Sequence, residues 1–210
     1  MADSPDEKLS QRQAASEKGI EAGQQMNALA NQARELDQKV QQWQQQFNQS
    51  DKQLVDADRK QQELATKAKE LSDKARALAQ EEIAKTQDQA KPIAPAVAQD
   101  LQSAQQTTQA AAEQMSKPMP AAAAMAKQAE QFAGTMDQAR QDLQQSESRM
   151  NDLPPAAKEQ AKELSPQVRQ EQQKAQELAQ MGRDLARQLN ELAGQDAQRL
   201  EQSPQQQQQV

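Results

Sequence analysis

Apolar side chains recur at alternating steps of four and three residues from Leu29 to Leu78. One half of this pattern consists of Leu29, Leu36, Trp43, Ser50, Ala57, Leu64, Leu71 and Leu78. The other half consists of Ala33, Val40, Phe47, Leu54, Gln61, Ala68 and Ala75. A repeat of this kind, kept over about seven heptads, predicts a left-handed coiled coil. We expect its large members to form an association seam: Leu29, Leu36, Val40, Trp43, Phe47, Leu54, Leu64, Leu71 and Leu78.

Clusters of proline divide the chain, because proline removes a backbone donor and clashes with the preceding helical turn. The start signal Ser4-Pro5-Asp6-Glu7 opens a long heptad-repeat helix that we expect over residues 4–91. Ala- and Met-rich helices are predicted over 92–153, with proline breaks at 92–95 and 117–120. A C-terminal helix is predicted over 154–202, after a turn at 153–155 and with a lesser disturbance near 165–166. The Gln-rich tail, 203–210, is expected to be disordered.

The segments after the first break repeat the same spacing, each in its own register. Their predicted core positions are Val97, Leu101, Ala104, Thr108, Ala111 and Met115; Ala122, Met125, Ala129, Phe132, Met136, Ala139, Leu143, Ser146, Met150 and Leu153; and Leu164, Val168, Glu171, Ala175, Leu178, Gly182, Leu185, Leu189 and Leu192. The predicted fold is therefore all-α, with helix over more than about three quarters of the chain. We expect an elongated coiled coil or antiparallel bundle, in which the later helices fold back on the long N-terminal one.

Two features of the first segment have alternative interpretations. A second helix start at Ser50-Asp51-Lys52-Gln53 would make a hairpin with a turn at 48–51, but the heptad phase passes through Ser50 unchanged and favours continuity. Trp43 and Phe47 lie four residues apart on one helical face. They could anchor a partner, since aromatic residues dominate interface hot spots, but their register favours ordinary core positions.

Composition narrows the classes of function. The chain has 46 Gln and 38 Ala among 210 residues, with 1% aromatic residues. Such a chain cannot fill a thick core around a buried small molecule, because aromatic residues bury about 150–250 Å² each and alanine far less. His and Cys are absent, which removes the commonest general base, the thiol nucleophile and the soft metal ligands. We therefore expect no enzyme, no catalytic, cofactor-binding or metal-binding residues, no cofactor and no small-molecule substrate.

Charge and hydropathy narrow the classes of partner. The formal net charge is −6 and the basic residues are interleaved with acids, so binding to nucleic acid is not expected. No apolar run approaches the roughly 20 residues that would span a bilayer, and the first residues contain no apolar leader segment. We expect a cytoplasmic protein with little membrane contact, although a fragment of a larger protein would have the same features.

A lone helix would leave the association seam in water, so we expect the seam to be covered by the later helices, a second copy or another helical protein. Charged residues flank it asymmetrically: Lys39, Lys60, Lys67 and Lys74 lie on one side, and Asp37, Asp51 and Asp58 lie on the other. A parallel self-pair would set the two sides against each other, whereas an antiparallel self-pair would oppose like charges.

The sequence thus favours a structural or interaction protein, a scaffold or spacer that acts through helix–helix association. In its helical character, its Ala and Gln content and its lack of Cys, the chain resembles phasin-type granule-coating proteins. That resemblance implies amphipathic helices laid on an apolar surface, but interfacial helices usually pair large apolar residues with a basic face, and this chain is acidic. A third possibility is a hydrophilic stress-protection chain that is disordered when free, which the unbroken heptads disfavour.

Overall fold

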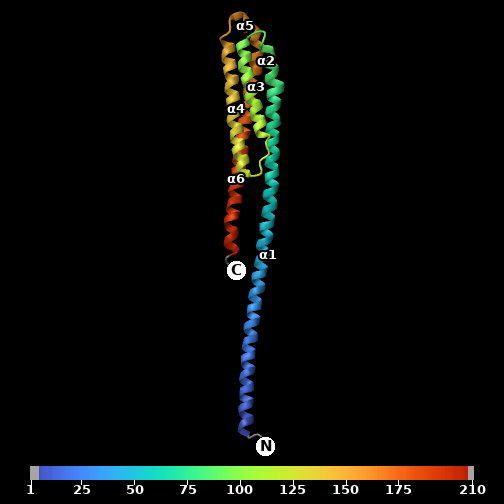
Figure 1. Ribbon diagram of the computed structural model, residues 1–210, viewed down its shortest axis with the longest axis vertical. Helices are drawn as coiled ribbons and strands as arrows, with labels where there is room; N and C mark the ends of the chain where they lie inside the picture. Colours follow the sequence, from blue (N-terminus) through green and yellow to red (C-terminus); the bar gives the residue numbers. More distant parts are fainter. Residues whose placement is uncertain (1–4, 208–210) are drawn as a thin grey trace. The chain divides into compact units, whose positions relative to one another are not determined.

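A computed structural model describes the backbone of residues 5–207 and the side chains of Leu9 and of residues 16–198. Helix makes up 93% of the structure, and no strand occurs between residues 5 and 207, so the all-α prediction is confirmed. The first stretch consists of α1 (Pro5–Ala77), the π-helical turn η1 (Leu78–Ile83) and α2 (Ala84–Ala90), which follow one another without a break (Figure 1). The helix is therefore continuous through residues 48–51, as the heptad phase favoured. Ser4, the predicted cap, lies outside the described residues.

The proline clusters end the helices where the sequence predicts. Helix α3 covers Pro95–Met115 and α4 covers Ala122–Asn151. After the turn at residues 152–154 come the short helix α5 (Pro155–Gln160), the 3-10 turn η2 (Ala161–Glu163) and α6 (Leu164–Gln207). The lesser disturbance predicted near 165–166 occurs slightly earlier, at η2. Pro166 itself lies in the first turn of α6. Backbone N–H groups in the first turn make no intrahelical hydrogen bond, so proline is tolerated there.

The predicted end of the last helix is too early. Helix α6 continues to Gln207, whereas the sequence suggested an end at residue 202 and a disordered tail over 203–210. Glutamine has a high helix propensity, so a Gln run prolongs a helix even without an apolar face. Residues 208–210 lie outside the described part of the chain.

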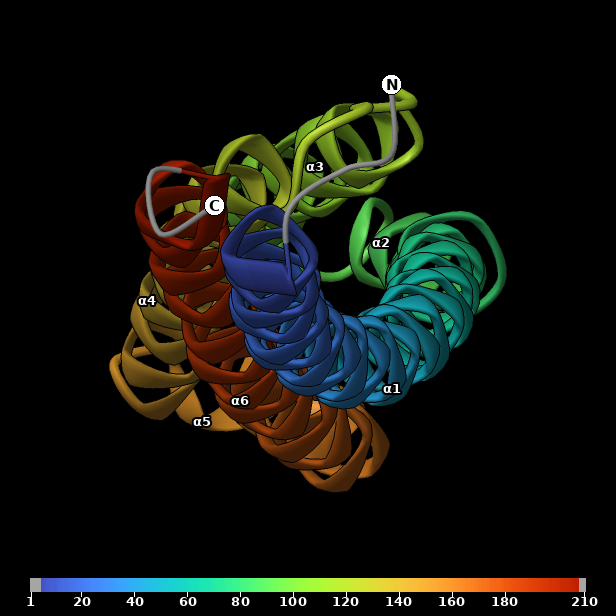
Figure 2. The same cartoon turned by 90° about the horizontal axis from the view of Figure 1, so that it is seen from below.

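The chain divides into two units, Met1–Asp56 (unit 1) and Ala57–Val210 (unit 2). Unit 2 is a helical bundle in which α2 contacts α3 and α6, α3 contacts α4, and α4 contacts α6. Seen along the helices in Figure 2, these neighbours follow one another around the bundle. Turns at 91–94, 116–121 and 152–154 join the successive helical stretches, so consecutive stretches run antiparallel (Figure 1).

The core of unit 2 matches the core positions predicted for residues 97–192. Each of those positions is buried except Leu153, which is partly buried against the core. The core is built mainly from alanine, with fully buried Phe132, Leu101, Leu143 and Leu189 among the larger side chains. Small residues let the helices approach closely. At Gly182 an added Cβ would stand 2.8 Å from Cδ1 of Phe132 and 3.2 Å from Cβ of Ala133.

The π-helical turn η1 changes the register of the first stretch. From Leu64 to Leu78 the buried apolar residues follow the predicted heptads, and beyond Leu78 those heptads would place residues 82, 85 and 89 inside. The structure instead buries Ile83, Thr86 and Ala90, one position later in each case. A π-helical turn accommodates one extra residue, so it rotates the following face by one position. This shift turns the hydroxyl of Thr86 toward the bundle interior.

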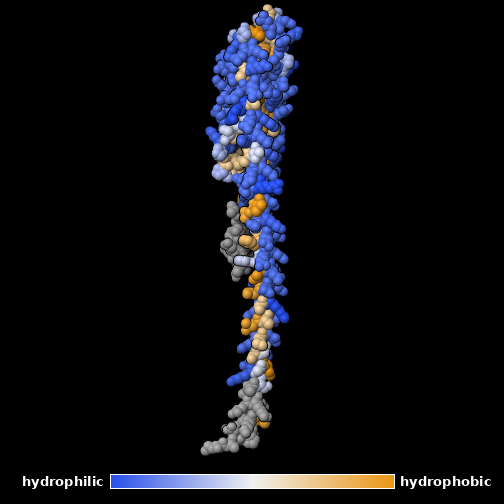
Figure 3. All heavy atoms as spheres, turned by 90° about the vertical axis from the view of Figure 1, so that its right-hand side faces the viewer, coloured by the Kyte–Doolittle hydropathy of each residue, from blue (hydrophilic) through white to orange (hydrophobic). Residues whose placement is uncertain are grey.

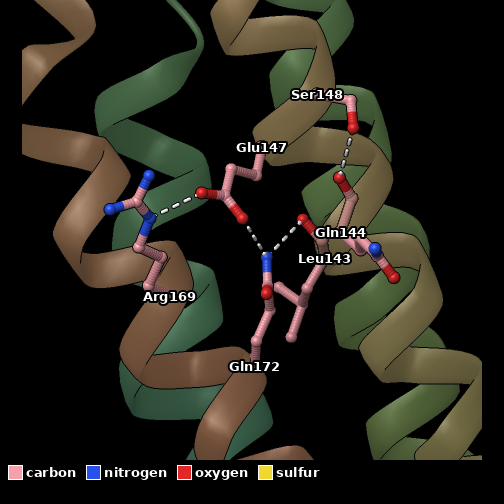
Figure 4. A network of polar contacts seen from close by, with 6 residues as sticks. All are labelled: Leu143, Gln144, Glu147, Ser148, Arg169 and Gln172. Carbon is pink, nitrogen blue, oxygen red and sulfur yellow. Dashed lines mark hydrogen bonds and ion pairs between the residues drawn. The ribbon is translucent and has the colours of Figure 1, made fainter.

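Polar contacts at the rim attach α4 to α6 (Figure 4). Nε of Arg169 donates to Oε1 of Glu147 at 2.5 Å, and Nε2 of Gln172 donates to Oε2 of the same carboxylate at 3.0 Å. The Gln172 amide also donates to the backbone carbonyl of Leu143 at 3.2 Å. The hydrogen bond from Arg169 is the main cause that lowers the pKa of Glu147, and burial partly opposes it.

Candidate association surface

The described residues of unit 1 belong to the first part of helix α1, and none of their described side chains is buried in a core. Every side chain between residues 16 and 56 is exposed to solvent. Between residues 29 and 54 the large apolar ones keep the predicted seven-residue spacing, so they form a stripe along one face of the helix. Isolated helices in water owe little stability to propensity alone, and most helices in proteins are stabilised by packing of an apolar face. The stripe of unit 1 is therefore the surface that most requires a partner.

Six large residues make up this stripe between residues 29 and 54, and we call these six the exposed seam. Their side chains are between 50% and 73% exposed: Leu29, Leu36, Val40, Trp43, Phe47 and Leu54. Figure 3 shows apolar residues, in orange, recurring along the corresponding part of α1 among hydrophilic ones. Trp43 is 60% exposed and Phe47 is 73% exposed, so neither is a core residue within its own chain.

The remaining members of the predicted seam have a different environment. Leu64, Leu71 and Leu78 are each 2% exposed and belong to the core of unit 2. The same helical face therefore packs inside the chain from Leu64 onward and is open to solvent up to Leu54. The sequence brought all nine residues together in one surface, and the structure divides them into an exposed group of six and a buried group of three.

This division also changes the meaning of the flanking charges. Three of the four lysines on one flank, Lys60, Lys67 and Lys74, lie in unit 2, where Nζ of Lys67 donates to Oε1 of Gln188 at 3.0 Å. Of these four lysines, only Lys39 flanks the exposed seam. Most of the cations that favoured a parallel self-pair therefore lie outside the exposed seam.

Among the described residues of unit 2, one acidic group that could carry chemistry is buried. Glu171 is 2% exposed, and its Oε1 accepts a hydrogen bond from the hydroxyl of Thr86 at 2.5 Å. Beside it, Nζ of Lys174 contacts Oε2 of Glu82 at 2.5 Å. Burial raises the pKa of Glu171 to about 7, with a further increase from the charge of Glu82 and opposing effects of Thr86 and Lys174.

This carboxyl group has no access to a substrate. Oε2 of Glu171 is buried and has no hydrogen-bond partner within the described part of the chain. The sequence pattern placed Glu171 at a core position, but it could not indicate Thr86 as its partner, because the shift at η1 moves Thr86 inward. The group can exchange a proton with solvent when the bundle opens, and its direct effect is on stability.

The remaining candidates for a functional site are a surface hollow, a metal-binding group and a membrane-spanning helix. A hollow near the turn between α3 and α4 is lined by glutamines, lysines, Ala124 and Met119, and no carboxylate lies in its lining to act as a base for the lysine amines. Among the described residues, no group of three acids could hold a metal ion. No helix in that part of the chain is long and apolar enough to cross a membrane.

Comparison with known proteins adds no further information about the surface. No family model, curated protein or solved structure matches the chain.

Proposed function

We propose that this protein is a non-enzymatic coiled-coil protein, a scaffold or spacer that acts through helix–helix association at the exposed seam. One observation carries the proposal. Six large apolar side chains in coiled-coil register are 50–73% exposed on a helix that has no covering neighbour among the described residues of unit 1. Full burial of such a side chain contributes about 1.5–3 kcal/mol, so a helical partner would gain several such contributions at once.

The packing of unit 2 supports the same function. Its core is filled from within the chain, because Leu64, Leu71 and Leu78 already contact the other helices of the bundle. Unit 2 therefore has little need of a partner to complete its core, and the seam positions that need one are confined to residues 29–54. This arrangement suits a folded bundle attached to an associating helix.

The test compares the full chain with a variant in which Leu36 and Phe47 are replaced by Gln. Glutamine keeps helix propensity but removes two apolar contacts per copy. The matched control carries Gln38→Ala and Gln45→Ala, at heptad positions opposite the seam. Molar mass from light scattering and helicity from circular dichroism are measured over a dilution series.

We expect the wild type and the control to form a defined oligomer that dissociates on dilution. The Leu36→Gln/Phe47→Gln variant should have the mass of a single chain at the same concentrations. A wild-type mass equal to one chain throughout would contradict the proposal. The proposal would also be contradicted if phospholipid vesicles raised the helicity in a seam-dependent way while the protein alone stayed monomeric. That result is expected of a protein that coats an apolar surface.

A further inference from the structure

The order of large and small residues along the exposed seam is symmetrical. When the two small residues in register, Ala33 and Ser50, are included, the order from Leu29 to Leu54 is large, small, four large, small, large. The same order results when the segment is followed backwards. Its centre lies between Gln41 and Gln42.

We infer that the exposed seam pairs with that of a second copy in antiparallel orientation, about a two-fold axis that passes between residues 41 and 42. The inference rests on the proposed function and specifies its partner. In an antiparallel pair each layer combines positions from the two halves of the heptad. The layers are then Leu29 with Leu54, Ala33 with Ser50, Leu36 with Phe47 and Val40 with Trp43, each formed twice.

Side-chain size favours this orientation over a parallel pair in register. The antiparallel pair combines each aromatic residue with a smaller aliphatic one, since Trp43 meets Val40 and Phe47 meets Leu36. A parallel pair would set Trp43 against Trp43 and Phe47 against Phe47 in successive layers, followed at once by a narrow layer of two serines. Such abrupt changes of width interfere with the regular insertion of knobs into holes.

The charges of unit 1 are complementary in the antiparallel pair. Exposed Arg34 lies on the same flank as exposed Asp51 of the second copy, within about 3 Å along the helix axis, and symmetry repeats this contact. Asp37 lies closest to Gln44 of the second copy and Lys39 closest to Gln46, so each of these charges meets a neutral residue. A parallel pair would instead place this flank, which carries Arg34, Asp37 and Asp51, against the flank with Lys39, so the contact between Arg34 and Asp51 would not form.

The area is sufficient for a specific dimer. An aromatic side chain buries about 150–250 Å² when fully covered, so Trp43 and Phe47 of the two copies bring on the order of 500 Å² at their present exposure. The four aliphatic members of the seam add a similar amount per pair of copies. The total is on the order of 1,000 Å², which reaches the lower limit for a stable interface.

Cysteine cross-linking tests the orientation directly, because the native chain has no Cys. Residues 33 and 50 of one helix are separated by about 25 Å along its axis, which exceeds the span of a disulfide several-fold. Ala33→Cys and Ser50→Cys are made separately in the full chain. Each is oxidised alone and as an equimolar mixture that has been unfolded and refolded together.

The expected result is a disulfide-linked dimer in the mixture and little or none in either variant alone. Dimers that form as readily in each variant alone would overturn the antiparallel pairing, and would leave the proposed association standing. The Gln38→Cys variant serves as control, because its position opposite the seam should not cross-link in either orientation. Equal cross-linking of this control, or no dimer in any sample, would also overturn the inference. The mass of the wild type then decides separately whether association occurs.

Discussion

The buried carboxyl of Glu171 makes the stability of unit 2 depend on pH. Burial holds its pKa in the folded chain at about 7, against an ordinary value of 4.5. Between these two pH values the folded chain keeps a proton on Glu171 that the unfolded chain has lost. Because the folded state binds more protons there, the free energy of unfolding falls as pH rises from 4.5 to 7 and levels off above that range.

The size of this effect follows from the pKa difference. Each pKa unit corresponds to 1.36 kcal/mol, so ionisation of Glu171 destabilises the folded chain by about 3 kcal/mol at pH 8 relative to pH 4.5. Glu171→Gln removes this titration and keeps an oxygen that can accept the hydrogen bond from Thr86. We expect the variant to be more stable than the wild type by about 3 kcal/mol at pH 8 and to differ little from it at pH 4.5.

Urea unfolding followed by circular dichroism, at several pH values between 4.5 and 8.5, measures this difference in the full chain. Glu177→Gln, an exposed position on the same helix, controls for the loss of one negative charge. Other acids titrate in both proteins, so the difference between Glu171→Gln and wild type isolates Glu171. If that difference is constant across the pH range, the buried position of Glu171 does not control its protonation and the reasoning is refuted.

Further predictions concern packing. Leu71→Ala should lower the free energy of unfolding in urea by about 2–5 kcal/mol, because Leu71 is 2% exposed, whereas Leu54→Ala should leave unit 2 unchanged at concentrations where the chain is monomeric. Equal effects of the two substitutions would contradict the division of the seam. Gly182→Ala should destabilise the bundle by about 1–3 kcal/mol, because its Cβ would meet Phe132. In the same urea assay Gly134→Ala should stabilise the bundle by about 0.4–1 kcal/mol, because its Cβ would meet nothing within 4 Å. If both substitutions changed the free energy of unfolding in the same direction, this account of Gly182 would be refuted.

Much of unit 2 could be predicted from the sequence, because its helices obey local rules. Proline has no N–H to donate, so Pro92, Pro118 and Pro154 mark turns wherever the helices pack. Spacing of apolar residues then identifies one face per helix, and even the polar Glu171 was placed correctly on it. The shift at Leu78–Ile83 was not predictable in this way, because a π-helical turn depends on tertiary packing and no proline or glycine marks it.

The residue at which the exposed seam ends could not be predicted from the sequence either. Leu54 and Leu64 belong to one heptad pattern, yet one is 62% exposed and the other 2%. The pattern specifies which face of α1 is apolar, but the number of residues that the later helices cover depends on their length and on where the proline turns fall. The boundary at Asp56 therefore lies inside an uninterrupted helix, with no local signal in the chain.

Amide hydrogen exchange of residues 29–54 over a dilution series tests the central claim most directly. If the exposed seam is covered by helix–helix association, protection of these amides should increase with protein concentration, while protection of residues 122–151 in unit 2 stays constant. Exchange of residues 29–54 that is the same at every concentration would contradict the claim that this surface associates.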